Sequence, residues 1–472
     1  MQPFSHFSAE IRAFLFISLT NRPDNCIVVN GSFSHEAGFY AEGRAMNHTS
    51  GRLIIGLTGS LGSGCTTLSK ALEDRGFKRI SISSLIKSKF RDLHEGKEPT
   101  RASYGPDWRA ELQDIGNKGR RGEFSPDRNS ETDVRTYWIE LALKSVQPEE
   151  EDIVIDGIRN AGEIEWLRNR YPNFWLVAVF ADQEKRWSRL RGTYDHDEKA
   201  FLRDDQRDSG EEEKSGQAVQ SCVYEADYVL KNVSPIEPPS DVKARLFARL
   251  EEPLKGMRNE EGFRGPLPAE VFMATAVSQS HASQCLKRKV GALIVDGENK
   301  IPLSVGYNEN PVGMESCYSL YEQVCYKDRV MASRLEKMVP FFCPECGTRH
   351  SKIGPPYLCN GKMNGGKPCR CNLKQRFFPS RAIELCTAIH AEERAILSLA
   401  GRSADGCTIF VNTFPCFQCA RQIVNARIKK VVYVEAYPIE EAVEFLKTNN
   451  VVIEPFEGFK PRVFNQVFKQ VE

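Results

Sequence analysis

The sequence predicts an α/β protein made of two consecutive α/β domains, and three observations support this. Its 472 residues exceed what one ordinary hydrophobic core fills, so two or three domains are expected. Short apolar runs typical of buried strands alternate with helical patterns over residues 51–252 and again over residues 265–472. Prolines cluster near residues 235–268, between the two stretches, and mark the domain boundary.

The first domain is expected to hold a parallel sheet with helices on both faces, because its strands alternate with helices. A helix from residue 66 to about residue 75 follows the first strand. Residues 1–50 show no clear period, and we expect a disordered extension there; a translation start at Met46 is the alternative. The strands are predicted at residues 53–57, 152–156, 175–180 and 226–230.

A glycine-rich turn joins the first strand to its helix, which is the context of a phosphate-binding Walker A loop. Thr66 could hold Mg²⁺ there together with Asp156, for which a helix cap is the alternative. Cys65 stands where such loops carry the lysine that reaches the β- and γ-phosphates, and this argues against efficient phosphoryl transfer. The candidate nucleotide-binding residues are Gly59, Ser60, Gly62, Ser63, Gly64, Cys65, Thr66 and Asp156.

Composition narrows the choice of partners. The net charge is only +1, whereas nucleic-acid-binding proteins usually show a strong basic excess. No apolar run reaches the length of a membrane-spanning helix, and residues 11–19 lack the basic start of a signal peptide. Most of the fifteen cysteines lie between Cys317 and Cys419, which favours metal binding in the reducing cytoplasm over disulfides.

The second domain carries a catalytic zinc pattern. His390-Ala-Glu392 is followed by Pro415-Cys416-Phe-Gln-Cys419, and the predicted strand at residues 407–412 lies between them. Three protein ligands, His390, Cys416 and Cys419, leave one zinc position open for water, whose pKa the metal lowers to about 7. Glu392 is close enough to shuttle that water's proton. The alternative is a structural site closed by Cys386 as fourth ligand.

A cysteine-rich insertion, about residues 312–380, interrupts this domain. Such a small Gly- and Pro-rich segment has too little apolar surface for a core, so a structural zinc is expected to order it. Five cysteines compete for four places, and the choice between the last two is open. They are Cys343, Cys346, Cys359, Cys369 and Cys371.

Residues 268–310 and 381–435 resemble the deoxycytidylate deaminase family through three motifs. They are the zinc pattern, the opening motif of the family with Val290-Gly291, and Gly306-Tyr307-Asn308. The resemblance implies that Asn308 hydrogen-bonds the nucleotide. It also implies a phosphate contact from one of Lys287, Arg288 and Lys289, for which a solvated edge is the alternative. Where the family often has Asn, this chain has Arg394, whose charge would suit a triphosphate unless it lies on the outer face of its helix.

The first domain resembles nucleotide kinases of the deoxynucleoside monophosphate kinase type, with Arg186, Arg189 and Arg191 similar to the arginines of a lid. Residues 204–217 are a charged run, expected to be that mobile lid or a solvated helix face. The lost lysine favours a nucleotide-binding regulatory module over an active kinase.

The order of the two halves, over about residues 51–470, resembles the bacterial anti-phage dCTP deaminases. That resemblance implies conversion of dCTP, and often dCMP, to deoxyuridine nucleotides, which drains the dCTP pool. It also implies homo-oligomers and, in some members, an inhibitory RNA partner. Two alternatives remain: a deaminase that edits tRNA or single-stranded DNA, and a nucleotide sensor whose deaminase half is inert.

Overall fold

The structure is a computed structural model that describes residues 52–468, except for some short segments. The predicted extension at residues 1–50 therefore lies outside the described residues. The segments left out are 106–107, 125–135, 145, 147–150, 210–217, 233–238, 299, 321–323, 339–340, 344, 351–358, 364–368, 370, 372–384 and 436–439.

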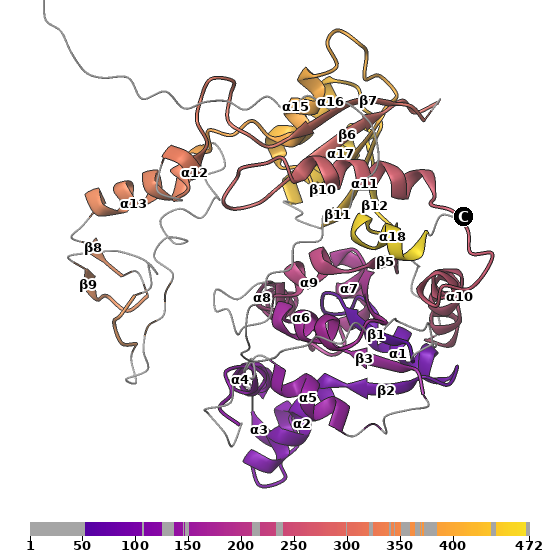
Figure 1. The fold of residues 1–472 in the computed structure, drawn as a ribbon. Helices are drawn as coiled ribbons and strands as arrows, with labels where there is room; N and C mark the ends of the chain where they lie inside the picture. Colours follow the sequence, from indigo (N-terminus) through magenta and orange to yellow (C-terminus); the bar gives the residue numbers. More distant parts are fainter. Residues whose placement is uncertain are drawn as a thin grey trace, which may run out of the picture. The chain divides into compact units, whose positions relative to one another are not determined.

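The first sheet confirms the predicted parallel strands (Figure 1). Its order is β13-β5-β4-β1-β3-β2, and β1 to β5 all pair in parallel. The predicted strands correspond to β1 (Ile54–Thr58), β3 (Ile153–Asp156), β4 (Phe174–Phe180) and β5 (Tyr228–Lys231). The edge strand β2 (Lys78–Ser81) was not predicted from the sequence.

Helices cover both faces of this sheet, as predicted, because its central strands are buried on both sides. One buried cluster joins alternate strand residues to α1 (Cys65–Glu73) and α10 (Pro239–Met257). The other cluster includes side chains of α2 (Ile82–Leu93), α4 (Trp108–Arg120), α5 (Tyr137–Lys144), α6 (Ala161–Arg170) and α9 (Val219–Glu225). The remaining helices are α3 (Arg101–Tyr104), α7 (Gln183–Leu190) and α8 (Glu198–Ser209).

The second sheet has the order β12-β11-β10-β6-β7. Its strands are β6 (Gly291–Val295), β7 (Pro302–Tyr307), β10 (Thr408–Thr413), β11 (Lys430–Glu435) and β12 (Val452–Pro455). Alternation of apolar residues gives it two buried faces. One face packs on α11 (Pro268–Ser280), and the other on α15 (Ala391–Leu397), α16 (Phe417–Asn425) and α17 (Glu440–Thr448).

The end of the chain returns to the first sheet. β13 (Gly458–Phe459) pairs antiparallel with β5, and η3 (Pro461–Val463) and α18 (Phe464–Val467) follow it. Phe459 is fully buried against Trp175 and Tyr228 of the first sheet. Residues assigned to the second domain by sequence thus complete the core of the first.

The insertion contributes α12 (Cys317–Leu320), α13 (Tyr326–Met338) and a hairpin of β8 (Phe341–Phe342) and β9 (Arg349–His350). Among the described residues, no helix is both long and apolar enough to span a bilayer.

Candidate functional site

The zinc-ligand candidates sit at the amino ends of two helices. His390 is the N-cap of α15, and Cys416 is the N-cap of α16, whose first turn carries Cys419. Both N-caps have extended backbone, which is usual for the residue that precedes a helix. β10 leads directly into the turn before Cys416, so the second sheet fixes the position of that helix.

The three donors have the spacing of a zinc site. His390 Nδ1 lies 3.3 Å from Cys419 Sγ and 3.4 Å from Cys416 Sγ. All three ligand atoms lie within 4.8 Å of one another. A tetrahedral zinc with ordinary Zn–N and Zn–S bonds would hold such atoms roughly 3.5 Å apart. The residues present therefore fit the metal.

The electrostatics of the trio favour a thiolate. Hydrogen bonds from Cys419 and then from His390 lower the pKa of the Cys416 thiol to about 4, against burial. The hydrogen bond to Cys416 raises the pKa of His390 to about 9. The hydrogen bond between the two thiols, followed by burial, raises the pKa of Cys419. Zinc ligation requires these groups to lose their protons, so metal and protons compete for them.

Glu392 lies beside the trio without joining it. Its side chain is buried and makes a hydrogen bond with the Cys419 thiol. Burial raises the pKa of its carboxyl, while the charge of His390 and the Cys419 hydrogen bond lower it. A carboxyl group held next to a metal site, with a raised pKa, suits proton transfer near neutral pH.

Cys386 does not close the site. Within the described part of the chain, the ligand group around His390 contains only Cys416 and Cys419 in addition. The arrangement therefore has three protein donors, which is the pattern of catalytic rather than structural zinc.

Two asparagines shape the loop that precedes β6. Asn308 accepts a hydrogen bond from the Val290 amide and donates one to the Arg288 carbonyl. Asn412, which the sequence analysis did not single out, accepts from the Gly291 amide and donates to the Lys289 carbonyl. Its only sequence signal is a polar residue inside an apolar strand.

The predicted basic residues lie in different surroundings. Lys287 pairs with Asp328, and Arg288 lies 3.3 Å from Glu435, whereas Lys289 is exposed. Arg394 pairs with Glu309, and its guanidinium lies 4.6 Å from the centre of the Tyr307 ring. Arg394 therefore faces the end of β7.

The insertion brings four thiols together. Cys343, Cys346, Cys359 and Cys369 form one ligand group within the described residues, and Cys371 stands outside it. His350 Nε2 lies 3.2 Å from Cys359 Sγ. Four converging thiols match a closed, structural zinc site.

The glycine-rich loop after β1 contains glycines in the left-handed region of φ. Gly62 and Gly64 have φ of +78° and +115°, and a Cβ on Gly64 would lie 2.4 Å from Asn232 Nδ2. Arg189 donates to the carbonyl oxygens of Gly62 and Ser63, which turns these carbonyls toward the protein.

The side chains around this loop differ in their burial and in their hydrogen-bond partners. Burial raises the pKa of the Cys65 thiol to about 12, so Cys65 brings no charge in place of the missing lysine. Asp156 is already bonded to Arg79 and Ser69, while Thr66 and Arg191 are exposed. Arg186 donates to the Leu61 carbonyl.

The predicted mobile lid takes another form. Residues 198–209 form α8, in which Asp205 and Asp208 are buried in ion pairs with arginines. In the described part of the charged run, Asp205 and Asp208 are therefore buried rather than solvated, whereas Asp204 is half-buried and accepts a hydrogen bond from Tyr194. Residues 210–217 of the run lie outside the described residues.

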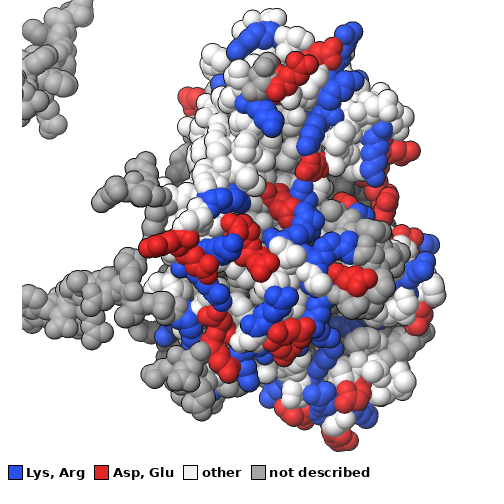
Figure 2. All heavy atoms as spheres, turned by 90° about the vertical axis from the view of Figure 1, so that its right-hand side faces the viewer, with Lys and Arg blue, Asp and Glu red and all other residues white. Residues whose placement is uncertain are grey.

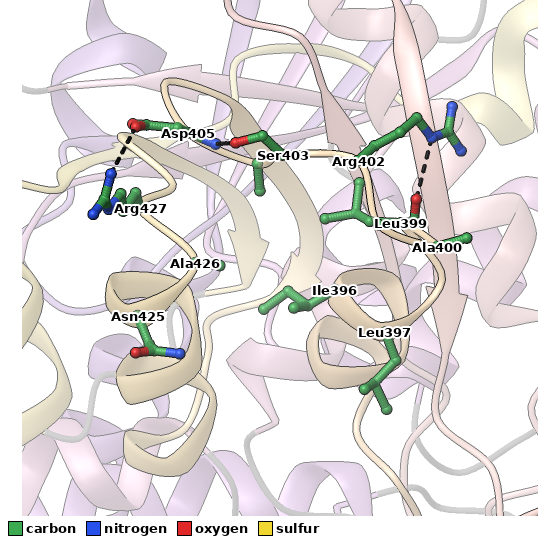
Figure 3. Close-up of a pocket in the computed structure, with 12 residues that line it drawn as sticks. Ile396, Leu397, Leu399, Ala400, Arg402, Ser403, Asp405, Asn425, Ala426 and Arg427 are labelled. Carbon is green, nitrogen blue, oxygen red and sulfur yellow. Dashed lines mark hydrogen bonds and ion pairs between the residues drawn. The ribbon is translucent and has the colours of Figure 1, made fainter.

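A surface hollow lies between residues 396–405 and residues 425–427 (Figure 3). It is bounded by the carboxyl ends of α15 and α16, whereas the zinc-ligand candidates lie at the amino ends of these helices. The two places are roughly 10 Å or more apart along helices of this length, so this hollow is not the zinc site.

Comparison with known proteins identifies the second half. Residues 268–435 match the family described as "Cytidine and deoxycytidylate deaminase zinc-binding region". These residues form a domain of the cytidine and deoxycytidylate deaminase type. The match contains His390, Glu392, Cys416 and Cys419.

Several curated proteins are similar to parts of the chain. Deoxycytidylate deaminase of Saccharomyces cerevisiae is 29% identical over 188 residues, which are 39% of this chain and 43% of the yeast protein. The enzyme of phage T4 is 29% identical over 174 residues, 36% of this chain and 79% of the phage protein. A UPF0200 protein of Methanothermobacter thermautotrophicus is 25% identical over 215 residues, 45% of this chain and 96% of its own length. The chain thus spans less than half the length of the yeast relative.

Among solved structures, the cyanophage S-TIM5 dCMP deaminase in complex with dCMP and dUMP is 23% identical. The match covers 41% of this chain and 99% of that chain, with a TM-score of 0.24.

Proposed function

We propose that this protein is a zinc-dependent deaminase of free deoxycytidine nucleotides. The observation that carries the proposal is the three-donor group of His390, Cys416 and Cys419 with the buried carboxyl of Glu392 against Cys419. The deoxycytidylate deaminases among the relatives support dCMP as one substrate.

The residues of the site have separate roles in the proposed reaction. His390, Cys416 and Cys419 hold the zinc, which when bound supplies an activated water for attack on C4 of cytosine. Glu392 accepts a proton from that water at its carboxylate and delivers it to the ring nitrogen. It then accepts a second proton from the hydroxyl group formed at C4 and delivers it to the amino group, which departs as ammonia. Asn308 and Asn412 hold residues 288–291 in place, so that the loop can present its basic side chains to the phosphate of the nucleotide.

The next proposals concern a second substrate, the biological role and the partners of the protein. dCTP is a substrate besides dCMP, with Arg394 facing the added phosphates once a ligand competes with Glu309 for its guanidinium. Depletion of dCTP serves anti-phage defence. The protein forms homo-oligomers, and an inhibitory RNA is a further partner.

Two more sites complete the proposal. A second zinc binds Cys343, Cys346, Cys359 and Cys369, and their convergence supports it. The loop at residues 59–66 binds a nucleotide with Mg²⁺ at Thr66, and it regulates the deaminase rather than transferring phosphate, because Cys65 carries no charge.

The charge distribution favours free nucleotides over polymers as substrates. On the face drawn in Figure 2, basic and acidic side chains of the described residues are interspersed rather than gathered into a basic stripe. Nucleic-acid binding draws its affinity mainly from such positive surfaces.

One substrate panel tests the proposal. Purified full-length protein would be given dCMP, dCTP, CTP, single-stranded DNA and tRNA, with zinc-stripped protein as the blank, and ammonia release would be measured. We expect turnover of dCMP and dCTP only. Turnover confined to the polymers would establish an editing enzyme, and nucleotide binding without any turnover would establish a sensor.

A further inference from the structure

A buried lysine links the end of the chain to a helix of the first half. Lys460 directly follows β13 and is 5% exposed. Its Nζ donates to the carbonyl oxygens of Val223 and Tyr224, in the last turn of α9, at 2.6 and 2.7 Å. The last carbonyl groups of a helix have no partner within it, so this ammonium group caps α9. A buried ammonium also needs a carboxylate nearby to offset the loss of its hydration.

Glu435 of the second sheet supplies such a carboxylate. Burial lowers the pKa of Lys460 to about 8, and the largest opposing charge is that of Glu435, followed by Asp227 and Glu225. Burial raises the pKa of the Glu435 carboxyl, which Arg288 and then Lys460 lower. α9 also packs against β11, and Glu435 is the last residue of β11. Lys460 and Glu435 therefore lie close together.

Glu435 also bonds to two parts of the candidate active site. Its Oε2 accepts a hydrogen bond from Thr413 Oγ1 at 3.4 Å and lies 3.3 Å from Arg288 Nη1. Its backbone carbonyl accepts from the Phe414 amide at 3.0 Å. Thr413 and Phe414 lead into the turn that carries Cys416, and Arg288 belongs to the loop assigned above to the phosphate. One residue at the end of β11 thus contacts both the turn and the loop.

We propose that Lys460 and Glu435 are positioning residues for deamination, through which α9 of the first half holds the Arg288 side chain at the phosphate end of the substrate. This role rests on the proposed function. Asn308 and Asn412 hold the backbone of the loop, whereas Glu435 holds the guanidinium of Arg288. Because α9 packs on β1 and β4, a movement of the first sheet reaches Arg288 through two buried charges. The regulation proposed for the first half acts along these contacts.

A comparison of dCMP with deoxycytidine, which has no phosphate, tests the role of Lys460. In the full-length protein, Lys460→Met should raise the KM for dCMP about tenfold and leave kcat within about threefold, because the contact to the phosphate weakens while the zinc ligands are unchanged. The kcat/KM for deoxycytidine should stay within about twofold of the natural value. The preference for dCMP over deoxycytidine should therefore fall.

A second variant serves if Lys460→Met does not fold. Glu435→Gln keeps the shape of the side chain but loses its charge, and it should show the same selective rise in the KM for dCMP. In an Arg288→Ala background, Glu435→Gln should change that KM by less than about twofold, because both substitutions act through the same guanidinium.

Glu454→Gln is the matched control. Glu454 lies on β12 of the second sheet, and its Oε1 pairs with Lys231 of the first half at 2.6 Å. In the part of the chain that the structure describes, its other ion pair is with Lys430 rather than with the loop at residues 287–291. This variant should keep the KM for dCMP within about twofold of the natural value.

The outcomes separate this role from the proposed function. If the natural protein deaminates dCMP, unchanged selectivity in both Lys460→Met and Glu435→Gln would overturn the role of these residues alone. So would equal losses with dCMP and deoxycytidine, or a KM increase in Glu454→Gln as large as that in Lys460→Met. A natural protein that does not turn over dCMP would overturn the proposed function itself.

Discussion

The two cysteine clusters of this molecule differ in their number of donors and in what surrounds them. The trio of His390, Cys416 and Cys419 rests on a five-stranded sheet with a large apolar core, and a buried glutamate stands next to it. The four thiols of the insertion rest on a two-stranded hairpin, and the buried cluster there consists of cysteines only, within the described residues.

The difference shows which physical need each cluster meets. The sheet already holds the trio in place, so a metal bound there would keep an open position beside an acid for chemistry. The described residues of the insertion form no apolar core besides the cysteines, so the proposed metal with four protein ligands would replace one. Loss of a ligand from the trio should therefore reduce catalysis. Loss of a ligand from the four thiols should instead reduce the local order of the insertion.

Cys416→Ser should produce the largest effect. We expect deamination of dCMP to fall at least about 10³-fold, because loss of this zinc removes the water on which Glu392 acts. Zinc content, measured by mass spectrometry, should fall from about two per chain to about one. Full activity with one zinc missing would mean that the trio is the structural cluster.

Cys346→Ser should have an intermediate effect. Zinc content should again fall by about one per chain, but activity should fall by less than about tenfold, because the trio and its sheet are untouched. Limited proteolysis should then cut the insertion faster than in the natural protein. If activity fell as far as in Cys416→Ser, the four thiols would not have a role separate from that of the trio.

Cys371→Ser should have the smallest effect. Cys371 lies outside the group of four thiols, so zinc content should stay at about two per chain and activity within about twofold. Loss of zinc from Cys371→Ser, together with retention of zinc in Cys369→Ser, would show that Cys371 rather than Cys369 is the fourth ligand.

Local spacing was enough to predict that the three proposed zinc ligands gather, because His390 caps the amino end of α15 and Cys416 and Cys419 lie at the amino end of α16. The choice among five cysteines could not be predicted, since it depends on how a later part of the insertion places Cys369 against Cys343, next to the hairpin. Asn412 was missed because its partner Gly291 is 121 positions away. The two-residue strand β13 has no periodicity, and only its fit beside β5 defines it.

The most direct test of the central claim is the turnover of dCMP by zinc-loaded Glu392→Gln, with Glu393→Gln on the same helix as its control. The amide keeps the size of the side chain but cannot accept the proton. We predict that Glu392→Gln retains its full zinc content and loses about 10³-fold in ammonia release, while Glu393→Gln stays near the natural rate. Turnover by Glu392→Gln within tenfold of the natural protein, at equal zinc content, would contradict the account.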